Sequence, residues 1–398
     1  MDEYIPRQSH AASRRAKRAD YRRELCRLMG LFLIAALLLV TAVNLLTPER
    51  AFSENENRIL ASRPAFSAEG VMDGSFMDDA ESWQADQFFA RDKWIALKLK
   101  TDTFLGKKES NGIYLGADNY LIAAPESPNE TAVQRNLAAI AAFAQAYNTL
   151  NIQMMIVPNA ASVMELWLPA NAPVRDQQAD LAALRAQLPP SMGFIDVTNA
   201  LRSHASEGVF YRTDHHWTSL GAYYAFQSAA PALGITELKS YVPHVVSTTF
   251  EGTLASRSGS HKVTDVIEVY EPVDPGSEFV VNYDATLEKS RSLFVSECLN
   301  EKDQYTVFFG GNHPRITIRT TANNGRVLLI FKDSYANCFV QFLTPYYETI
   351  LLIDPRYYYD DAGALMADEG VTDVLFLYNL DTWLSDTSLA DTLTSAAE

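Results

Sequence analysis

The order of apolar and polar positions divides the chain into segments of different character. From about residue 130 onward, stretches with apolar residues at helical spacing alternate with short, continuous apolar runs. The helical stretches are 131–148, 176–188 and 218–230, and the apolar runs are 152–158, 193–197, 326–331, 349–354 and 371–378. Such alternation is typical of a parallel sheet with helices on both faces, so we predict an α/β fold.

Residues 235–322 interrupt this alternation. They are rich in Val, Thr, Ser and Gly, and they contain period-two stretches at 263–270 and 305–309. We predict a β-rich insertion that lies beside the sheet. Such an insertion would either shape a substrate cleft or act as a stabilising flap.

Two local patterns stand out between residues 47 and 125. Residues 81–100 carry aromatic and aliphatic side chains at helical intervals. Residues 111–122 contain two apolar runs joined by Gly-Ala-Asp-Asn, which are residues that accept turn conformations. We expect a helix in the first and a structural hairpin in the second.

Near the amino terminus, residues 28–46 are uncharged and mostly Leu, Ile, Ala, Val and Phe. About twenty such residues cross a bilayer as a helix. Because the preceding residues 1–27 are basic, we predict an uncleaved anchor with a cytoplasmic amino terminus and an extracellular remainder. A cleaved signal peptide fits less well because the apolar core is long and no small-x-small site follows it. A buried helix of a soluble protein fits poorly with the flanking arginines.

These patterns give a domain organisation. We expect a basic cytoplasmic tail at 1–27, a transmembrane signal anchor at 28–46, a juxtamembrane region at 47–125 and an α/β domain at 126–398. The β-rich insertion at about 235–322 belongs to the last of these. With 398 residues, 47% of them hydrophobic, the chain can bury a sizeable core.

Charge is distributed unevenly along the chain, whose formal net charge is −16. Residues 1–27 hold eight Lys and Arg against four acidic residues, a net of +4, and the other 25 bases and 45 acids give −20. A domain this acidic repels nucleic acid. The three cysteines are too few and too scattered for a disulfide framework or a zinc motif, although a single Cys298–Cys338 bridge stays open.

Candidate chemistry is concentrated in two short segments. Asp214, His215 and His216 are consecutive residues just before a predicted helix, and their proton affinities suit general-base catalysis. Ser334 follows a predicted strand and precedes a helix, where backbone N–H groups favour developing negative charge. The alternatives are a helix-capping role for Ser334 and a packing role for the histidines.

Zinc is a competing interpretation of the histidine segment. Asp214, His215, His216 and His313 could act as its ligands. Neighbouring residues in an extended segment point in opposite directions, which makes joint ligation by His215 and His216 awkward. We therefore expect no metal and no cofactor.

Four motifs together resemble one family. They are Thr213-Asp214-His215-His216-Trp217, Asn111-Gly112-Ile113-Tyr114-Leu115-Gly116, Gly310-Gly311-Asn312-His313-Pro314 and Lys332-Asp333-Ser334-Tyr335-Ala336-Asn337. They resemble the DHHW protein family of Gram-positive bacteria, which is similar to the alginate O-acetylation proteins with their SGNH-hydrolase-like fold. The resemblance covers nearly everything after the apolar segment.

The resemblance implies roles for individual residues. The acetylation proteins carry an Asp-x-His-Trp motif that supplies acid and base, and Asp214 and His216 match it, with His215 in the variable middle position. Their nucleophile lies in Gly-Asp-Ser, which Ser334 matches, although Lys332 stands in place of the glycine. As in those proteins, the histidine precedes the serine along the chain.

An oxyanion-binding asparagine is also part of the SGNH pattern. Asn379, directly after the apolar run 371–378, is the nearest match, and Asn312 in the Gly-Gly-Asn stretch is a rival. A simple turn residue is the alternative for Asn379. Either side chain would assist the backbone N–H groups that bind the oxyanion or the substrate, and His215 is a further candidate for this binding role.

The expected function combines these features. We expect a membrane-anchored extracellular O-acetyltransferase or acetylesterase that acts on a cell-surface polysaccharide of the cell envelope through an acetyl-serine. Related systems imply a membrane-bound O-acyltransferase as the partner that supplies acetyl groups. The alternative is a surface glycan-binding or assembly protein that keeps the fold without the chemistry.

Overall fold

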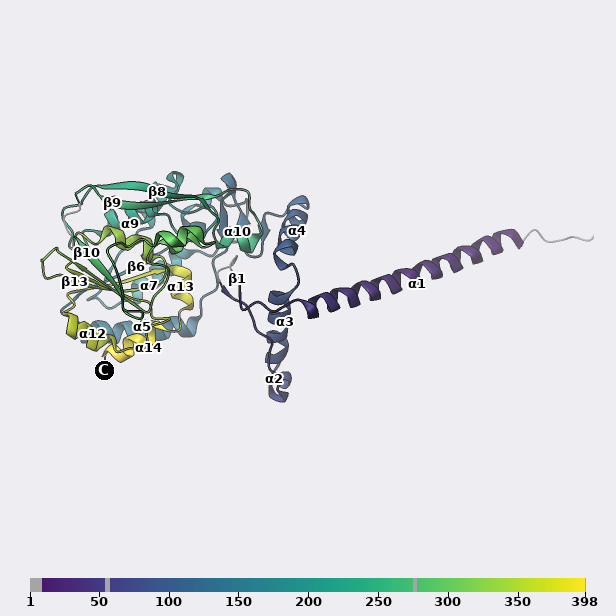
Figure 1. Cartoon of the computed structure of the whole chain (residues 1–398), viewed down its shortest axis with the longest axis horizontal. Coiled ribbons are helices and arrows are strands. Elements are labelled where there is room, and N and C mark those ends of the chain that lie inside the picture. Colours follow the sequence, from purple (N-terminus) through teal and green to yellow (C-terminus); the bar gives the residue numbers. More distant parts are fainter. Residues whose placement is uncertain (1–8, 54–57, 275–277, 398) are drawn as a thin grey trace, which may run out of the picture. The chain divides into compact units, whose positions relative to one another are not determined.

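The computed structural model describes residues 9–53, 58–274 and 278–397. The chain divides into two units, one reaching to Trp94 and the other running from Ile95 to the carboxyl end (Figure 1). All three cysteines are free thiols. Each unit is described by itself.

The first unit is dominated by the long helix α1 (Ser9–Leu46). Within it, Asp20–Leu46 is long and apolar enough to cross a membrane, with a mean hydropathy of 2.5. After it come the short strands β1 (Phe52–Ser53) and β2 (Arg58–Ile59), and the helices α2 (Ala68–Asp73) and α3 (Ser75–Gln87). Helix α4 (Arg91–Phe104) begins in this unit and ends in the second. The helix expected over 81–100 is thus broken before Arg91, where Ala90 adopts a positive φ of 53°.

An eight-stranded sheet forms the centre of the second unit, in the order β11-β10-β12-β14-β13-β15-β6-β7. Five of its strands are parallel: β6 (Asn151–Val157), β7 (Gly193–Phe194), β13 (Val327–Lys332), β14 (Thr349–Ile353) and β15 (Asp373–Asn379). If β13, β14 and β15 are numbered 1, 2 and 3 and β6 and β7 are numbered 4 and 5, the order across the sheet is 2-1-3-4-5. Strands 4 and 5 of this order precede strand 1 in the chain. In sheets of this order, ligands bind beyond the carboxyl ends of strands 1 and 3, which here are β13 and β15.

Both faces of the parallel strands β13, β14 and β15 are buried, and their successive side chains point to opposite sides of the sheet. In β13, Leu328 and Ile330 join one core, while Leu329 and Phe331 join the other. The first core includes α8 (Thr198–Ser203) and α9 (Ser219–Ala229), and the second includes α5 (Glu130–Ala146), α7 (Gln177–Gln187), α12 (Ala362–Glu369), α13 (Leu380–Ser385) and α14 (Leu389–Ala397). The predicted SGNH-like α/β fold is confirmed.

The predicted insertion is β-rich, but its position differs from the expectation. Strands β10 (Phe279–Tyr283), β11 (Glu288–Ser290) and β12 (Arg315–Thr320) extend the central sheet, with β12 antiparallel to β14. Among the residues of the insertion that the structure describes, only β8 (Tyr241–Phe250) and β9 (Asp265–Pro272) form a separate ribbon. The expectation that the insertion lies beside the sheet is therefore wrong for β10 to β12, because the open edge of β14 offers unpaired backbone groups that β12 satisfies.

Two further predictions have different outcomes. The hairpin at 111–122 is confirmed as β4 (Ile113–Leu115) and β5 (Leu121–Ala123), joined through a 3₁₀ turn, with β3 (Glu109–Ser110) beside them. The prediction of β structure from the period-two spacing at 305–309 is wrong, because Gln304–Val307 forms a 3₁₀ helix. Tyr305, Val307 and Phe308 are all buried, so the apolar spacing reflects a turn enclosed in the core.

Candidate active site

The turn that holds Ser334 follows β13 at its carboxyl end and leads into α11 (Ala336–Phe339). The carboxylate of Asp333 fixes this turn, because it accepts hydrogen bonds from the Tyr335 N–H at 2.9 Å and the Asn379 N–H at 2.9 Å. Burial raises the pKa of this carboxyl, and the two hydrogen bonds oppose that rise. This nucleophile turn, so called because Ser334 is the candidate nucleophile, is thereby tied to the end of β15, across the point where ligands bind in this sheet order.

A tight loop presents the histidine segment. Its ends are held by the antiparallel bridge between Phe210 and Trp217, and Tyr211 N–H donates to the His216 carbonyl at 3.2 Å. Inside the loop, the Asp214 carboxylate accepts from the backbone N–H of His216 at 3.0 Å. The Asp214 carboxylate therefore stabilises its own loop, and this hydrogen bond holds it in place beside the imidazole.

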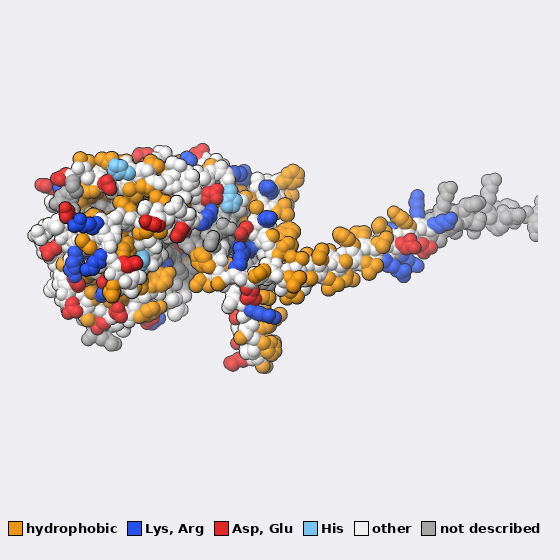
Figure 2. All heavy atoms as spheres, viewed as in Figure 1, with side chains coloured by type: hydrophobic (Ala, Val, Ile, Leu, Met, Phe, Trp, Pro, Cys, Tyr) orange, Lys and Arg blue, Asp and Glu red, His pale blue; other side chains and the backbone are white. Residues whose placement is uncertain are grey.

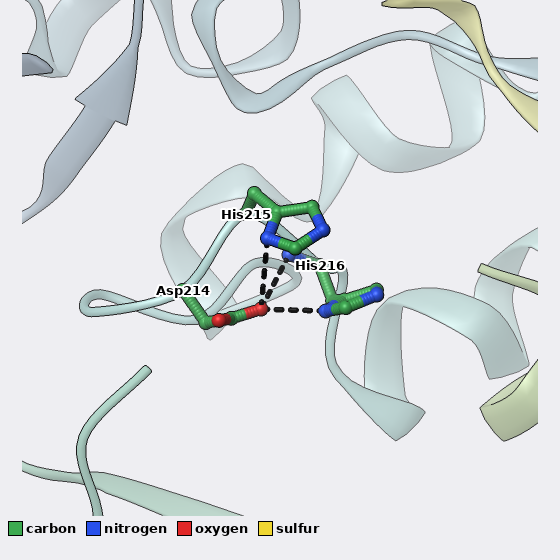
Figure 3. A group of neighbouring side chains, drawn as sticks. All are labelled: Asp214, His215 and His216. Carbon is green, nitrogen blue, oxygen red and sulfur yellow. Dashed lines mark hydrogen bonds and ion pairs between the residues drawn. The ribbon is translucent and has the colours of Figure 1, made fainter. Parts of the chain in front are cut away.

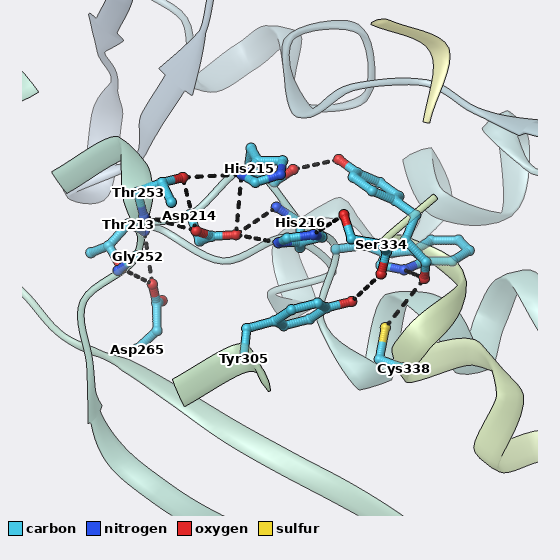
Figure 4. A network of polar contacts seen from close by, with 12 residues as sticks. Thr213, Asp214, His215, His216, Gly252, Thr253, Asp265, Tyr305, Ser334 and Cys338 are labelled. Carbon is cyan, nitrogen blue, oxygen red and sulfur yellow. Dashed lines mark hydrogen bonds and ion pairs between the residues drawn. The ribbon is translucent and has the colours of Figure 1, made fainter. Parts of the chain in front are cut away.

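Asp214, His216 and Ser334 form one hydrogen-bonded chain. The Nδ1 of His216 lies 2.6 Å from Asp214 Oδ1, and its Nε2 lies 2.8 Å from Ser334 Oγ (Figure 4). Asp214 and His216 are only 3% and 6% exposed. The structure brings these three candidate residues together, and the arrangement can pass a proton from the hydroxyl to the imidazole.

The second oxygen of Asp214 is held by Thr253, the first residue of α10 (Thr253–Ser258). It accepts from the Thr253 N–H at 2.9 Å and from the hydroxyl at 3.1 Å. Burial by itself raises the pKa of the Asp214 carboxyl, but the two imidazoles and these hydrogen bonds hold it well below its usual range. Asp214 is therefore a fixed negative charge beside His216.

Gly252 makes room for this carboxylate. A Cβ added at Gly252 would lie 2.2 Å from the Asp214 Cβ and 2.4 Å from its Oδ2. The Gly252 N–H donates to the hydroxyl of Thr213 at 3.0 Å, and that hydroxyl donates to Asp265 at 2.6 Å. The Asp214 carboxylate thus packs directly against the backbone of Gly252. The hydrogen bonds around it fix the segment of Thr213 and Asp214 against the segment of Gly252 and Thr253 (Figure 4).

Three aromatic side chains hold the segments that carry the candidate residues His216 and Ser334. The ring of Tyr305 stacks on His216 with a centroid distance of 3.8 Å, and its hydroxyl donates to the Ser334 carbonyl at 3.0 Å. The Trp217 indole donates to the Tyr335 carbonyl at 2.9 Å, and the Tyr335 hydroxyl donates to the His215 carbonyl. These bonds connect the histidine loop to the nucleophile turn from both sides.

His215 lies at the surface of the same cluster, with 43% of its side chain exposed. Its ring centroid is 3.9 Å from that of His216, and its Nδ1 is 3.1 Å from the Thr253 hydroxyl. The expectation that the two rings point in opposite directions is wrong, because the segment is a turn and not an extended strand (Figure 3).

The grouping of Asp214, His215 and His216 meets one requirement of a metal site, since their ligand atoms lie within 4.8 Å of one another. However, both ring nitrogens of His216 already contact Asp214 and Ser334. His313, the fourth expected ligand, contacts the Phe309 carbonyl at 2.9 Å instead. A bound metal would have to break the Asp214–His216–Ser334 chain, so these residues fit proton transfer better than ligation.

The two asparagines proposed for the oxyanion have other partners. The Asn379 amide donates to Asn159 Oδ1 at 2.7 Å, and its oxygen caps α13 through the Asp381 N–H at 3.1 Å. The Asn312 oxygen accepts from Lys332 Nζ at 3.1 Å. Asn379 lies at the end of β15 beside the nucleophile turn, and its role in oxyanion binding stays a prediction, as does that of Asn312.

Lys332, which stands where the related motif has glycine, is only 1% exposed. Its ammonium donates to Asn337 Oδ1 at 2.8 Å and lies 3.7 Å from Asp354, which Arg356 also contacts at 2.6 Å. Burial lowers the pKa of this lysine. The side chain therefore joins the nucleophile turn to the end of β14, and it takes no part in the Asp214–His216–Ser334 chain.

Several of these contacts have no counterpart in the sequence motifs. Thr253 and Tyr305 contact the candidate triad from the insertion, far along the chain from both Asp214 and Ser334. Gly252 before a Thr that begins a helix was the one available signal, since glycine permits close backbone approach. The sequence alone does not tell that the side chain of Asp214 is the one that approaches Gly252.

Comparisons with known proteins agree with this architecture. A family model described as DHHW protein matches residues 118–353. The crystal structure of a DHHW family protein from Eubacterium siraeum is 24% identical, with a TM-score of 0.62 over 72% of this chain and 96% of that one. PatB1 of Bacillus cereus, solved with a sulfonyl adduct, is 20% identical, with a TM-score of 0.59 over 70% of this chain and 97% of that one.

A more distant likeness is to the O-acetyltransferase domain of Pseudomonas putida AlgJ. It is 16% identical, with a TM-score of 0.45 over 71% of this chain and 99% of that domain. At that distance it has no bearing on function. No curated protein matches the chain.

Proposed function

The chain belongs to the DHHW protein family, and on that premise we propose that it is a membrane-anchored serine-dependent O-acetyltransferase, or acetylesterase, acting on a cell-surface polysaccharide. The observation that carries the proposal is the hydrogen-bonded chain from Asp214 through His216 to Ser334. Its motifs resemble those of the alginate O-acetylation proteins, which supports acetyl transfer as the chemistry.

In the first half-reaction, His216 Nε2 removes the proton from Ser334 Oγ, which attacks the carbonyl carbon of an acetyl donor. The negative charge of Asp214 stabilises the imidazolium that forms. When the tetrahedral intermediate collapses, the bond from the carbonyl carbon to the donor heteroatom breaks. His216 returns the proton to that leaving group, and an acetyl-serine remains.

The oxyanion of the tetrahedral intermediate needs hydrogen-bond donors close to Ser334. Within the described residues the Ser334 N–H has no hydrogen-bond acceptor, which leaves it available for this charge. The Asn379 amide is a second candidate if it turns away from Asn159. Both groups lie at the switch point of the sheet, at the ends of β13 and β15.

In the second half-reaction, an acceptor hydroxyl attacks the acetyl-serine. His216 takes the proton from that hydroxyl and returns it to Ser334 Oγ as the ester bond breaks. A sugar hydroxyl gives an O-acetylated glycan, and water gives acetate. The net charge of −20 after residue 27 disfavours a polyphosphate acceptor and favours neutral or amino-sugar glycans.

Helix α1 supports the proposed location. Its apolar part is long enough to cross a membrane, and the basic residues before it favour a cytoplasmic amino terminus. The catalytic domain is then extracellular, in the cell envelope. Acetyl groups made in the cytoplasm cannot reach it unaided, so a membrane-bound O-acyltransferase is the proposed partner that delivers them.

Hydrolysis of p-nitrophenyl acetate by the full-length protein in detergent tests the chemistry. Ser334→Ala and His216→Ala should each abolish turnover, while Ser296→Ala, an exposed serine elsewhere, should leave it unchanged. A sulfonyl fluoride, chosen because PatB1 was solved with a sulfonyl adduct, should modify Ser334 and be detected by peptide mass spectrometry. Undiminished turnover in both triad variants, each shown to be folded, would end the proposal.

A non-catalytic role in glycan binding or surface assembly is the alternative. The observation that favours it is the engagement of the Asn379 amide by Asn159, which leaves the oxyanion site incomplete as it stands. This alternative expects glycan binding that Ser334→Ala does not change, together with no modification by the sulfonyl fluoride.

A further inference from the structure

Helix α4 exposes a stripe of large apolar side chains. Trp94, Leu97 and Phe104 are 47%, 51% and 89% exposed, and Leu105 in the following turn is 66% exposed. Their spacing places them on one face of the helix. The other face is turned inward, because Leu99 and Asp102 are buried. Side chains of this size are normally covered when they form a continuous stripe.

Basic residues border this stripe. Lys93 and Lys100 lie along one side of it by helical spacing, Lys98 lies along the other, and all three are exposed. Residues 91–108 hold six Lys and Arg against two Asp, a net of +4, within a chain whose residues after 27 carry −20. Figure 2 shows hydrophobic and basic side chains together over α4. The helix is therefore opposite in charge to the domain that it leads into.

We propose that α4 lies in the headgroup region of the membrane, with its apolar stripe in contact with lipid and its lysines on anionic headgroups. This pattern of a basic polar border with Trp, Phe and Leu on one face is that of helices lying in a membrane interface. The proposal rests on the proposed anchor, since α4 follows the candidate membrane-crossing helix α1 in the chain. A protein partner would be the alternative occupant of the stripe.

Position in the chain favours lipid as the occupant, because α4 follows the candidate membrane-crossing helix α1. Anionic lipid attracts Lys and Arg side chains that lie near the membrane surface. Burial of the apolar stripe adds to this attraction. Since α4 ends inside the second unit, its binding to lipid gives that unit an attachment to the membrane that is separate from α1.

Fluorescence of a polarity-sensitive probe tests the proposal in the full-length protein reconstituted in vesicles of phosphatidylcholine and phosphatidylglycerol. Cys26→Ser and Cys298→Ser remove the accessible thiols, whereas Cys338 is fully buried and burial raises the pKa of its thiol to about 12. The probe is attached at Phe104→Cys. Spin-labelled phosphatidylcholine should quench it, and Lys93→Glu with Lys100→Glu should reduce that quenching.

Two control positions make the result decisive. A probe at Leu39→Cys in α1 reports insertion of the anchor, and a probe at Tyr359→Cys, an exposed aromatic residue outside α4, reports an aqueous surface. Quenching at 104 at least twofold greater than at 359 supports the proposal. Equal quenching at 104 and 359, with strong quenching at 39, would overturn the docking of α4 while leaving the anchor intact. Without quenching at 39, the anchor itself fails, and the docking of α4 fails with it.

Discussion

The ring of Tyr305 lies flat against the imidazole of His216, at a centroid distance of 3.8 Å and an interplanar angle of 13°. Its hydroxyl also donates to the Ser334 carbonyl at 3.0 Å. One buried side chain from the insertion therefore contacts both the proposed base and the backbone of the proposed nucleophile. The insertion completes the site as well as extending the sheet.

We expect the two functions of Tyr305 to separate by mutation. Tyr305→Phe keeps the stack and loses one hydrogen bond, worth about 1 kcal/mol of unfolding free energy, with a small effect on turnover. Tyr305→Leu also removes the flat surface that holds the imidazole, so kcat/KM for p-nitrophenyl acetate should fall further. Activity assays and thermal unfolding of both variants measure this. Equal kcat/KM in the Leu and Phe variants would show that the stack does not orient His216.

A second prediction concerns the charge beside the imidazole. Asp214→Asn keeps the shape of the side chain but removes the carboxylate that His216 Nδ1 contacts at 2.6 Å. The imidazole would then lose the partner that fixes its tautomer, and turnover should fall on the order of 10³- to 10⁴-fold. Thr253→Val, which removes only one donor to the same carboxylate, should have a much smaller effect. The ratio of kcat in the Asp214→Asn variant to kcat in the Thr253→Val variant tests whether the carboxylate matters more than the hydroxyl that donates to it.

Gly252→Ala should impair the site by steric displacement. The added Cβ would overlap the Asp214 side chain, and the φ of −79° at Gly252 allows alanine, so backbone strain is not the cause. Misplacing a catalytic group by about 1 Å can cost on the order of 100-fold in rate. Gly325→Ala is the matched control, because its φ of +69° strains alanine in open space. The control should lose stability and keep its activity.

The sequence predicts the centre of this fold well for a physical reason. Strands β13, β14 and β15 are buried on both faces and appear as continuous apolar runs, and their bounds lie within about two residues of those expected. The run predicted at 193–197 is shorter than expected, since only Gly193–Phe194 forms the strand β7. Strand β12 alternates apolar and polar residues instead, β10 and β11 show no such period, and none of these patterns tells which edge of the sheet the strands join. The topology of the insertion therefore needed the structure.

The candidate site also has one part that the sequence predicts and another that only the structure reveals. Asp214, His216 and Ser334 were predicted because each lies in a short motif with its own chemical signature. Thr253 and Tyr305 are ordinary residues locally, and only the pairing of distant segments brings them to the site. Lys332 was noted as a departure from glycine, but its burial against Asn337 and Asp354 could not be read from its neighbours in the chain.

Lys332 should contribute to stability more than to chemistry. Lys332→Met leaves the amide oxygens of Asn312 and Asn337 without this donor, which should lower the unfolding free energy by about 1–3 kcal/mol. Asp354 keeps its contact with Arg356. The loss of unfolding free energy should therefore be smaller than the loss expected when a buried charge is left without any partner. Urea unfolding beside the exposed control Lys289→Met measures this. An unchanged midpoint would show that the buried ammonium is not a structural requirement.

Asp303 makes the stability of the domain depend on pH. Burial, and the negative charge of Asp214, raise the pKa of its carboxyl to about 6. Between its ordinary value near 3.8 and pH 6, the folded protein keeps a proton that the unfolded chain releases, so this group lowers stability as pH rises through that window. Asp303→Asn should therefore match the parent near pH 4 and have a higher Tm at pH 7.5, whereas Asp368→Asn on the surface should not. Thermal melts at both pH values measure the difference, and a Tm gain of equal size at pH 4 would contradict titration as its cause.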